Sequence, residues 1–515
     1  MQSRILSAAV VGVDARLVEV ECDVSGAVMA FDTVGLPELS VREARYRVRS
    51  AMRASGLKFP TRSVLVNLAP ADLRKDGTCY DLPLALALLA ADGALPPGVL
   101  DGFVVVGELS LMGGVRPAVG VLAMAQLVRD LGLRGLLCPA DNVAEARAVH
   151  GIEVRAAQTL AGVAECLRTG ADWPEPATVN RPVPARTHAL CWSDIRGHAV
   201  AKRALEVAAA GGHNVVMVGT PGTGKTMLAR RLPTVLPPLD DGEAVEVTKV
   251  HSVAGLLTHG AGLLAERPFR APHHTISAAA LVGGGSIPKP GEVSLAHRGV
   301  LFLDELAEYP RHVLETLRQP LEDGTVTVTR ARQVARFPSQ VMLVAALNPC
   351  PCGRRGSTTH ACTCSHVALE RYRGRLSGPL LDRIDLQVRV PALEAGALRG
   401  GSDGDTSAVV QARVCAARRV QTDRFGPGVT NATVPMPRLR QASPLATPVH
   451  DVLLRALETF GLSPRAHDRI WRVARTIADL GGAPTVEIGH IAEALQYRCF
   501  DEPAAFGPAG SALAA

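Results

Sequence analysis

The sequence has few aromatic residues and no long apolar run. Phenylalanine, tryptophan and tyrosine make up 3% of the 515 residues, which argues against broad stacking platforms for single-stranded bases. No uninterrupted apolar stretch reaches the ~18 residues that a membrane-spanning helix needs. The apolar patch near the N-terminus meets charge at Asp14 and Arg16, which is typical of a strand rather than of a secretory signal. We therefore expect a cytoplasmic protein with no membrane contact and with mostly reduced cysteines.

The chain also has little net charge for its length. Its 55 basic and 49 acidic side chains leave a formal charge of +6, which permits contact with nucleic acid but does not indicate it. The length itself suggests about three domains.

Composition divides the chain into five segments, and we expect an α/β multidomain protein. Strand-like and helical runs alternate in the first segment, and short, continuous apolar strands typical of a parallel sheet covered on both faces occur in the third. The segments are an N-terminal domain (1–168), a proline-rich linker (169–190), a parallel-sheet core (191–395), a small helical C-terminal domain (396–500) and a flexible tail (501–515).

The stretch "GTPGTGKT" predicts a phosphate-binding loop. It fits G-x-x-x-x-G-K-[ST] in full, follows the apolar run "NVVMVG" and precedes a helical run. Glycines allow backbone amides to point at an anion, and a helix N-terminus favours negative charge. Lys225 would reach the β- and γ-phosphates of ATP, and the Thr226 hydroxyl would bind Mg²⁺. The predicted ATP-binding residues of the loop are Gly219, Thr220, Pro221, Gly222, Thr223, Gly224, Lys225 and Thr226.

Two later apolar runs supply the expected partners of that loop. "GVLFLDE" places Asp304 to hold Mg²⁺ and Glu305 to polarise the attacking water. "QVMLVAALNP" ends at Asn348, whose amide can sense the γ-phosphate and orient the water. Each feature alone has an ordinary structural explanation, an acidic strand cap or a turn-forming asparagine. In this order they resemble the motifs of AAA+ ATPases, with Asn348 as the sensor-1 residue.

Longer stretches resemble the YifB family of magnesium-chelatase-like AAA+ proteins, which includes ComM-like competence proteins. Among them are "RPFRAPHHTISAAALVGGG", "NPCPCG" and "RAHDRIWRVARTIADL", and the resemblance covers nearly all of residues 1–500. It implies a homo-oligomeric ring, expected to be a hexamer. It also implies that ATP hydrolysis drives a DNA helicase or branch migration on branched or single-stranded DNA.

The same resemblance assigns roles to two arginines. Arg383 in "LSGPLLDRIDL" would act in trans on the nucleotide of a neighbouring subunit; a surface pair with Asp382 or Asp385 is the alternative. Arg465 would be the sensor-2 arginine that contacts ATP, with Arg469 as the nearby alternative.

The N-terminal domain resembles the proteolytic domain of Lon proteases, with a ribosomal-S5-like fold. The stretches that carry this resemblance are "LRKDGTCYDLPLALALL" and "VGELSLMGGVRPAVGVL". Cys79 stands at the position of the Lon serine and Leu122 at that of its lysine. A thiol needs a base or a lowered pKa to act as a nucleophile, and leucine supplies neither. We therefore predict a scaffold without protease activity.

Four cysteines lie close together in "NPCPCGRRGSTTHACTCSH". Cys350, Cys352, Cys362 and Cys364 form two C-x-C pairs that could hold structural Zn²⁺, with reduced, unligated thiols as the alternative.

An arginine-bearing hairpin is expected between Asp304 and Asn348. "TVTVT" and "QVARF" alternate like its two arms, with Arg330 and Arg332 near the bend as candidate DNA contacts. A solvated charged turn is an equally good interpretation. The segment with His273 and His274 is expected to form a second pore element, and we assign it no metal.

The substrate stays open between three classes. The leading hypothesis is a DNA motor, and the alternatives are a chelatase-like or protein-remodelling ATPase and a regulatory ATPase without motor action. A Lon-like domain fits the chelatase hypothesis poorly, because chelatase ATPase subunits are expected to lack it.

Overall fold

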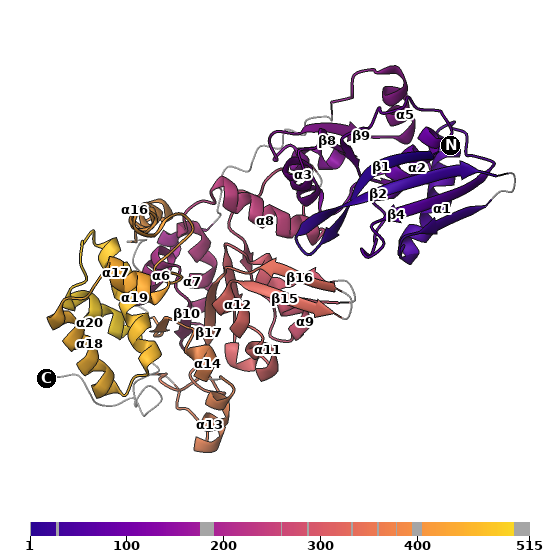
Figure 1. The fold of residues 1–515 in the computed structure, drawn as a ribbon. Helices are drawn as coiled ribbons and strands as arrows, with labels where there is room; N and C mark the ends of the chain where they lie inside the picture. The colour runs from indigo at the N-terminus through magenta and orange to yellow at the C-terminus, as the bar shows by residue number, and fades with distance from the viewer. Residues whose placement is uncertain are drawn as a thin grey trace.

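The structure is a computed structural model that describes most of the chain. The described residues are 2–26, 30–175, 190–258, 260–285, 288–330, 333–357, 360–376, 378–393 and 404–498. Figure 1 shows an N-terminal sheet, a central sheet and a cluster of C-terminal helices.

A seven-stranded mixed sheet organises the N-terminal part. In spatial order its strands are β3 (Phe31–Val34), β4 (Ser63–Ala69), β2 (Asp14–Ser25), β1 (Gln2–Val11), β5 (Phe103–Val105), β8 (Gly135–Pro139) and β9 (Glu153–Ala157). Neighbouring residues of β5 point to opposite faces, as a pleated strand requires: Phe103 and Val105 join one core cluster and Val104 the other.

Helices cover both faces of this sheet. One core cluster includes α1 (Leu39–Ala54), α2 (Asp81–Ala91) and α5 (Leu160–Thr169), and the other includes α3 (Val121–Asp130) and α4 (Val143–Ala146). The remaining elements are short: β6 (Glu108–Leu109), β7 (Val115–Arg116) and the 3-10 turn Ala140–Asn142.

The central sheet is parallel throughout, as the continuous apolar strands predict. Its spatial order is β11 (Phe269–Arg270), β14 (Val300–Leu303), β17 (Met342–Leu347), β10 (Val215–Val218) and β18 (Leu386–Arg389). The three middle strands are buried along their whole length, because separate apolar clusters cover the two faces. Residues that follow β10, β14 and β17 therefore meet at one edge of the sheet.

Short helices and hairpins surround this sheet. They are the 3-10 turn Trp192–Asp194, α6 (Ala199–Gly211), α7 (Lys225–Arg231), the 3-10 turn Leu232–Val235, α8 (Asp241–Val253), α9 (Ala278–Val282), β12 (Gly283–Gly284), β13 (Lys289–Pro290), α10 (Glu292–Leu295), the 3-10 turn Leu306–Glu308, α11 (Arg311–Glu315), α12 (Arg318–Asp323), β15 (Thr325–Arg330), β16 (Gln333–Pro338), α13 (His366–Gly374) and α14 (Gly378–Leu381).

The C-terminal helices share a core with the central sheet. They are α16 (Ser407–Phe425), α17 (Met436–Ala442), α18 (Thr447–Phe460), α19 (Pro464–Leu480) and α20 (Ile488–Gln496). One apolar cluster runs from α6 and β10 into α16, α19 and α20. The side chain of Gln421 on α16 also donates to the carbonyl of Ala210 on α6 at 3.0 Å. The helical segment is thus continuous in packing with the sheet, and it also has a small apolar cluster of its own that contains Phe425, Val434, Leu439 and Trp471.

The N-terminal part contacts the central part through α8. The Lys249 ammonium on α8 donates to Asp14 at 2.7 Å, and the Ser252 hydroxyl donates to the buried Glu145 carboxylate. In the described residues, no helix combines the length and apolar character that a membrane crossing requires.

Candidate nucleotide-binding site

The phosphate loop joins β10 to α7. Gly224 precedes α7 with φ of 82°, a left-handed conformation that glycine adopts without strain. Gly219 is needed for close approach, because a Cβ there would lie 2.3 Å from the carbonyl oxygen of Val390. The predicted strand, loop and helix are therefore confirmed in their order.

Lys225 is buried at the base of the loop. Its ammonium donates to the carbonyls of Gly219 (2.6 Å) and Thr220 (3.0 Å) and to Oδ1 of Asn348 (3.3 Å). Burial lowers the pKa of Lys225, and the nearby carboxylates of Asp304 and Glu305 oppose that shift. The structure thus brings the loop lysine and the predicted sensor asparagine together.

The predicted magnesium ligands also lie together. The Thr226 hydroxyl donates to Oδ2 of Asp304 at 2.7 Å. Oδ1 of Asp304 accepts from the backbone N–H of Glu305 at 3.0 Å. A hydroxyl and a carboxylate are the hard oxygen donors that Mg²⁺ prefers, so this pair fits the ion.

Glu305 has a contact that sequence spacing did not reveal. It has φ of 51°, unusual for a residue with a side chain, and its carboxylate is exposed. Nδ1 of His274 lies 3.4 Å from Oε2 of Glu305. The adjacent rings of His273 and His274 are 4.1 Å apart. The histidine pair was visible in the sequence, but no local pattern linked it to an acid in a later strand.

Arg383 lies at the opposite edge of the central sheet. Its carbonyl accepts from the side chain of Asn214, which directly precedes β10, whereas the phosphate loop follows β10. The four residues of β10 separate the two edges by about 13 Å. The Arg383 guanidinium donates to Pro379 at 2.5 Å and pairs with Glu322. The pair with Asp382 or Asp385 that the sequence left open is therefore replaced by one with Glu322.

The two candidate sensor-2 arginines lie near that same edge. Arg465 pairs with Asp382 at 3.2 Å, and Asp382 directly precedes Arg383 in the sequence. Arg469 donates to the buried Asp385 at 2.5 Å. The structure brings Arg465 together with the Arg383 segment and does not bring it to the phosphate loop of its own chain.

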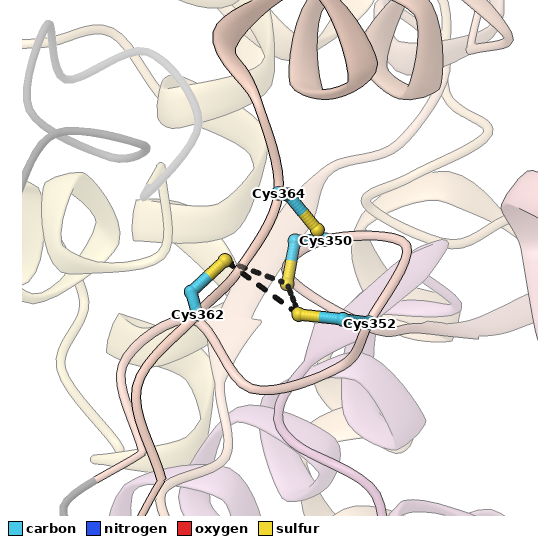
Figure 2. A group of neighbouring side chains, drawn as sticks. All are labelled: Cys350, Cys352, Cys362 and Cys364. Atoms are coloured by element: carbon cyan, nitrogen blue, oxygen red, sulfur yellow. Dashed lines mark hydrogen bonds between the residues drawn. The ribbon is translucent and has the colours of Figure 1, made fainter.

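The four clustered cysteines converge in space. Their sulfurs all lie within 4.8 Å of one another, and Figure 2 shows the side chains pointing inward from two segments of chain. The cluster is therefore compatible with the Zn²⁺ site that the sequence left open.

The hairpin between Asp304 and Asn348 forms as expected. Strands β15 and β16 pair antiparallel from Thr325 opposite Pro338 to Arg330 opposite Gln333. Arg332 and the side chain of Arg330 lie outside the described residues, so their role as DNA contacts stays a prediction.

Cys79 shows no activation as a nucleophile. Burial, with a smaller effect of Asp81, raises the pKa of its thiol to about 12. Cys79 packs against the apolar cluster that contains Leu122. This environment favours the protonated thiol, and the absence of protease activity stays a prediction.

A phosphate loop, an acidic pair and a polar asparagine at one edge of a parallel α/β sheet define a P-loop ATPase. Three family models match the chain. They are described as "Magnesium chelatase, subunit ChlI" over residues 191–398, "Subunit ChlI of Mg-chelatase" over residues 20–142 and "Magnesium chelatase, subunit ChlI C-terminal" over residues 404–498.

Two full-length relatives and one partial relative extend this result. The chain is 44% identical to the competence protein ComM of Haemophilus influenzae, over 96% of this chain and 97% of that protein. It is 41% identical to the protein YifB of Escherichia coli, over 96% of each. It is 29% identical to the magnesium-chelatase 67 kDa subunit of Heliobacterium mobile, over 33% of this chain and 30% of that protein. The chain belongs to the magnesium-chelatase-like AAA+ ATPase family that includes ComM and YifB, and this family implies ATP and Mg²⁺ as ligands.

Proposed function

We propose that this chain assembles into a ring, expected to be a hexamer, and uses ATP hydrolysis to move DNA as a helicase or branch-migration motor. The observation that carries the ring is the position of Arg383. About 13 Å of strand separates it from the phosphate loop of its own chain, which supports a role for Arg383 at a nucleotide bound to a neighbour.

Residues of this chain have separate roles in ATP hydrolysis. Glu305 polarises the attacking water, and Asn348 orients that water against the γ-phosphate. Lys225 and the neighbour's arginine finger stabilise the charge that develops on the transferred phosphoryl group. Mg²⁺, held through Thr226 and Asp304, would neutralise phosphate charge.

Arg383 and Arg465 act across the same subunit contact in this proposal. Arg383 directly follows Asp382 in the sequence, and Arg465 forms an ion pair with Asp382 at 3.2 Å. Arg383 Nε is buried and has no hydrogen-bond partner among the described atoms, so this donor would become available to an incoming phosphate only if the side chain moved. When subunits assemble, the Arg383 guanidinium would leave Glu322 to reach the neighbour's nucleotide.

DNA as the substrate is supported by a relative and by the hairpin. The relative is named a competence protein, and the chain of the hairpin carries arginines at 330, 332 and 336. Arg336 is exposed, while Ala335 and Phe337 on either side of it are buried. A solvent-facing arginine and a basic tip suit phosphate contacts without base readout.

A mixing experiment tests the shared active site. Lys225→Ala removes nucleotide binding but keeps the finger, and Arg383→Ala keeps binding but removes the finger. We expect each variant to be inactive alone and a mixture to recover part of the wild-type ATPase rate, because some contacts then pair an intact loop with an intact finger. A mixture that stays as inactive as its components would refute the shared site.

A DNA panel tests the substrate. We expect forked or branched DNA to raise the ATPase rate, and Arg330→Ala/Arg332→Ala to abolish that increase while leaving the DNA-free rate intact. If no DNA form changes the rate and a protein partner does, the DNA proposal fails.

The chelatase-like alternative retains support from the family descriptions. The model that matches residues 20–142 is itself described as a magnesium-chelatase subunit. The N-terminal domain therefore does not separate the two functions, contrary to the expectation from its Lon-like sequence, and the DNA panel has to decide between them.

A further inference from the structure

The sulfur atoms of the cysteine cluster have the spacing of ligands around one metal ion. The separations are 3.4 Å between Cys350 and Cys352 and 3.6 Å from Cys362 to each of them. Zn–S bonds of about 2.3 Å in a tetrahedron place sulfurs about 3.8 Å apart. With Cys364 inside the same 4.8 Å group, the set has the number and kind of ligands that close a structural zinc site.

The cluster ties two segments of chain together. Cys350 and Cys352 follow β17, and Cys362 and Cys364 precede α13. Cys350 is fully buried and accepts a hydrogen bond from the backbone N–H of Arg355 at 3.3 Å. Amide donors to sulfur are second-shell contacts that hold a ligand in place.

The turn at Gly353, directly after Cys352, lies against the phosphate loop. Gly353 has φ of 74°, and a Cβ added to it would lie 2.8 Å from both Cγ and Cδ of Pro221. Pro221 is part of the loop that would surround the ATP phosphates. The position of this turn therefore limits where the loop can lie.

A second contact reaches the sensor asparagine. The Tyr372 hydroxyl on α13 donates to the Asn348 carbonyl at 3.1 Å, and Asn348 Oδ1 accepts from Lys225 at 3.3 Å. Asn348 precedes Cys350 by two residues. The two cysteine pairs thus anchor both the asparagine and the helix that supports it.

We propose that Cys350, Cys352, Cys362 and Cys364 bind one Zn²⁺ and that this metal braces the phosphate loop through Gly353 and Pro221. Loss of the metal then weakens nucleotide binding without any change in the residues that contact ATP. The bracing part rests on the proposed ATP site and is independent of the ring and of DNA. Binding converts thiols to thiolates and releases their protons, with no change of oxidation state.

Metal analysis of the purified full chain tests the first part. We expect about one zinc per chain, and the same content in Cys415→Ser, which removes a half-buried cysteine of α16 outside the cluster. The double variant Cys362→Ser/Cys364→Ser should contain none. Co²⁺ exchanged into the wild-type chain should give thiolate charge-transfer and tetrahedral d–d absorption. A chain without metal, with four freely reactive cluster thiols, or one holding iron instead, would overturn the zinc site.

Nucleotide affinity tests the second part without using hydrolysis. A fluorescent ATP analogue should bind about tenfold more weakly after a mercurial reagent and a chelator remove the zinc, with the Cys415→Ser protein as the treated control. Gly353→Ala separates bracing from metal binding, since it should keep its zinc and still bind the analogue about tenfold more weakly because of the collision with Pro221. Unchanged affinity in both cases would overturn the bracing. Failure of either the ring or the DNA proposal would leave these results untouched.

Discussion

Nδ1 of His274 lies 3.4 Å from Oε2 of Glu305. The histidine follows β11, and the glutamate follows β14, the adjacent strand of the central sheet. Glu305 is held at a φ of 51°, so its backbone already fixes the direction in which the side chain leaves the strand. The contact with His274 then determines where the carboxylate points.

Replacing His274 with alanine is expected to lower kcat by roughly ten- to hundredfold, because a misplaced carboxylate no longer aligns the attacking water. ATP affinity should stay near the wild-type value, since His274 acts through Glu305 and does not hold phosphate. Steady-state kinetics and a nucleotide-binding titration measure the two effects. His274→Asn, which keeps a donor, should restore part of the rate.

His273→Ala is the matched control for this prediction. His273 stacks on His274 at 4.1 Å but bonds through Nδ1 to the Thr275 hydroxyl at 2.9 Å. Its removal should affect kcat much less. Equal losses in the two variants would indicate a general packing role for the pair.

Lys225 predicts a ligand-dependent change in thermal stability. Its ammonium donates to two loop carbonyls, and the phosphate oxygens of ATP would offer it charged acceptors. Mg-ATP at a hundred times its Kd should stabilise the wild-type chain by about 2.7 kcal/mol. Lys225→Ala should lose nearly all of this gain, whereas Arg230→Ala, an exposed charge on the same helix, should keep it. Thermal unfolding with and without Mg-ATP measures the difference.

Sequence patterns were sufficient for the parts of the site that are local. The runs around Val216, Phe302 and Val344 are continuous and apolar, which predicted buried parallel strands. The phosphate loop, Asp304 and Asn348 each follow one of these runs directly, and Lys225 belongs to the loop motif. Strand ends in a parallel sheet meet at one edge. That rule alone brings Lys225, Asp304 and Asn348 together.

The contacts that the sequence missed join segments whose relative position depends on the whole fold. Two helices and three strands lie between His274 and Glu305 in the described chain, and no periodicity encodes their distance in space. The helix around Arg465 was predictable from its apolar stripe, but its meeting with Asp382 depends on the core that α19 shares with α6. Tertiary packing therefore decided these positions.

His297 predicts a loss of stability in mild acid. Its side chain is 2% exposed; Nδ1 accepts the backbone N–H of Gln340, and Nε2 meets Glu246, each at 3.1 Å. Burial is the main cause that lowers the pKa of His297 from its ordinary value of 6.5; Glu246 opposes this shift and Arg298 adds to it. Protonation would put a hydrogen on Nδ1 of His297. That N–H would then face the backbone N–H of Gln340, and the hydrogen bond between them would be lost.

The direction of the pH dependence of stability follows from the lowered pKa of His297. The unfolded chain takes up the proton near pH 6.5 and the folded chain only at lower pH, so the stabilisation is complete above pH 6.5 and is lost as pH falls through the folded pKa. Urea midpoints should therefore decrease between pH 7.5 and 5. His297→Gln should show a weaker pH dependence, because glutamine keeps both contacts without titrating. The exposed His312→Gln should behave like the wild type.

Asp479 predicts a large loss of stability on truncation. Its fully buried carboxylate accepts from Arg475 at 2.9 Å, from Arg424 at 2.7 Å and from the Asn431 amide at 2.8 Å, joining α19 to α16. Asp479→Ala leaves two arginines in the interior without their counter-charge and should cost about 3–5 kcal/mol. Asp130→Ala removes a carboxylate that is 62% exposed beside Arg129, and should change stability by less than about 0.5 kcal/mol. Urea unfolding followed by circular dichroism compares the two, and similar small effects would show that this network does not hold α19 to α16.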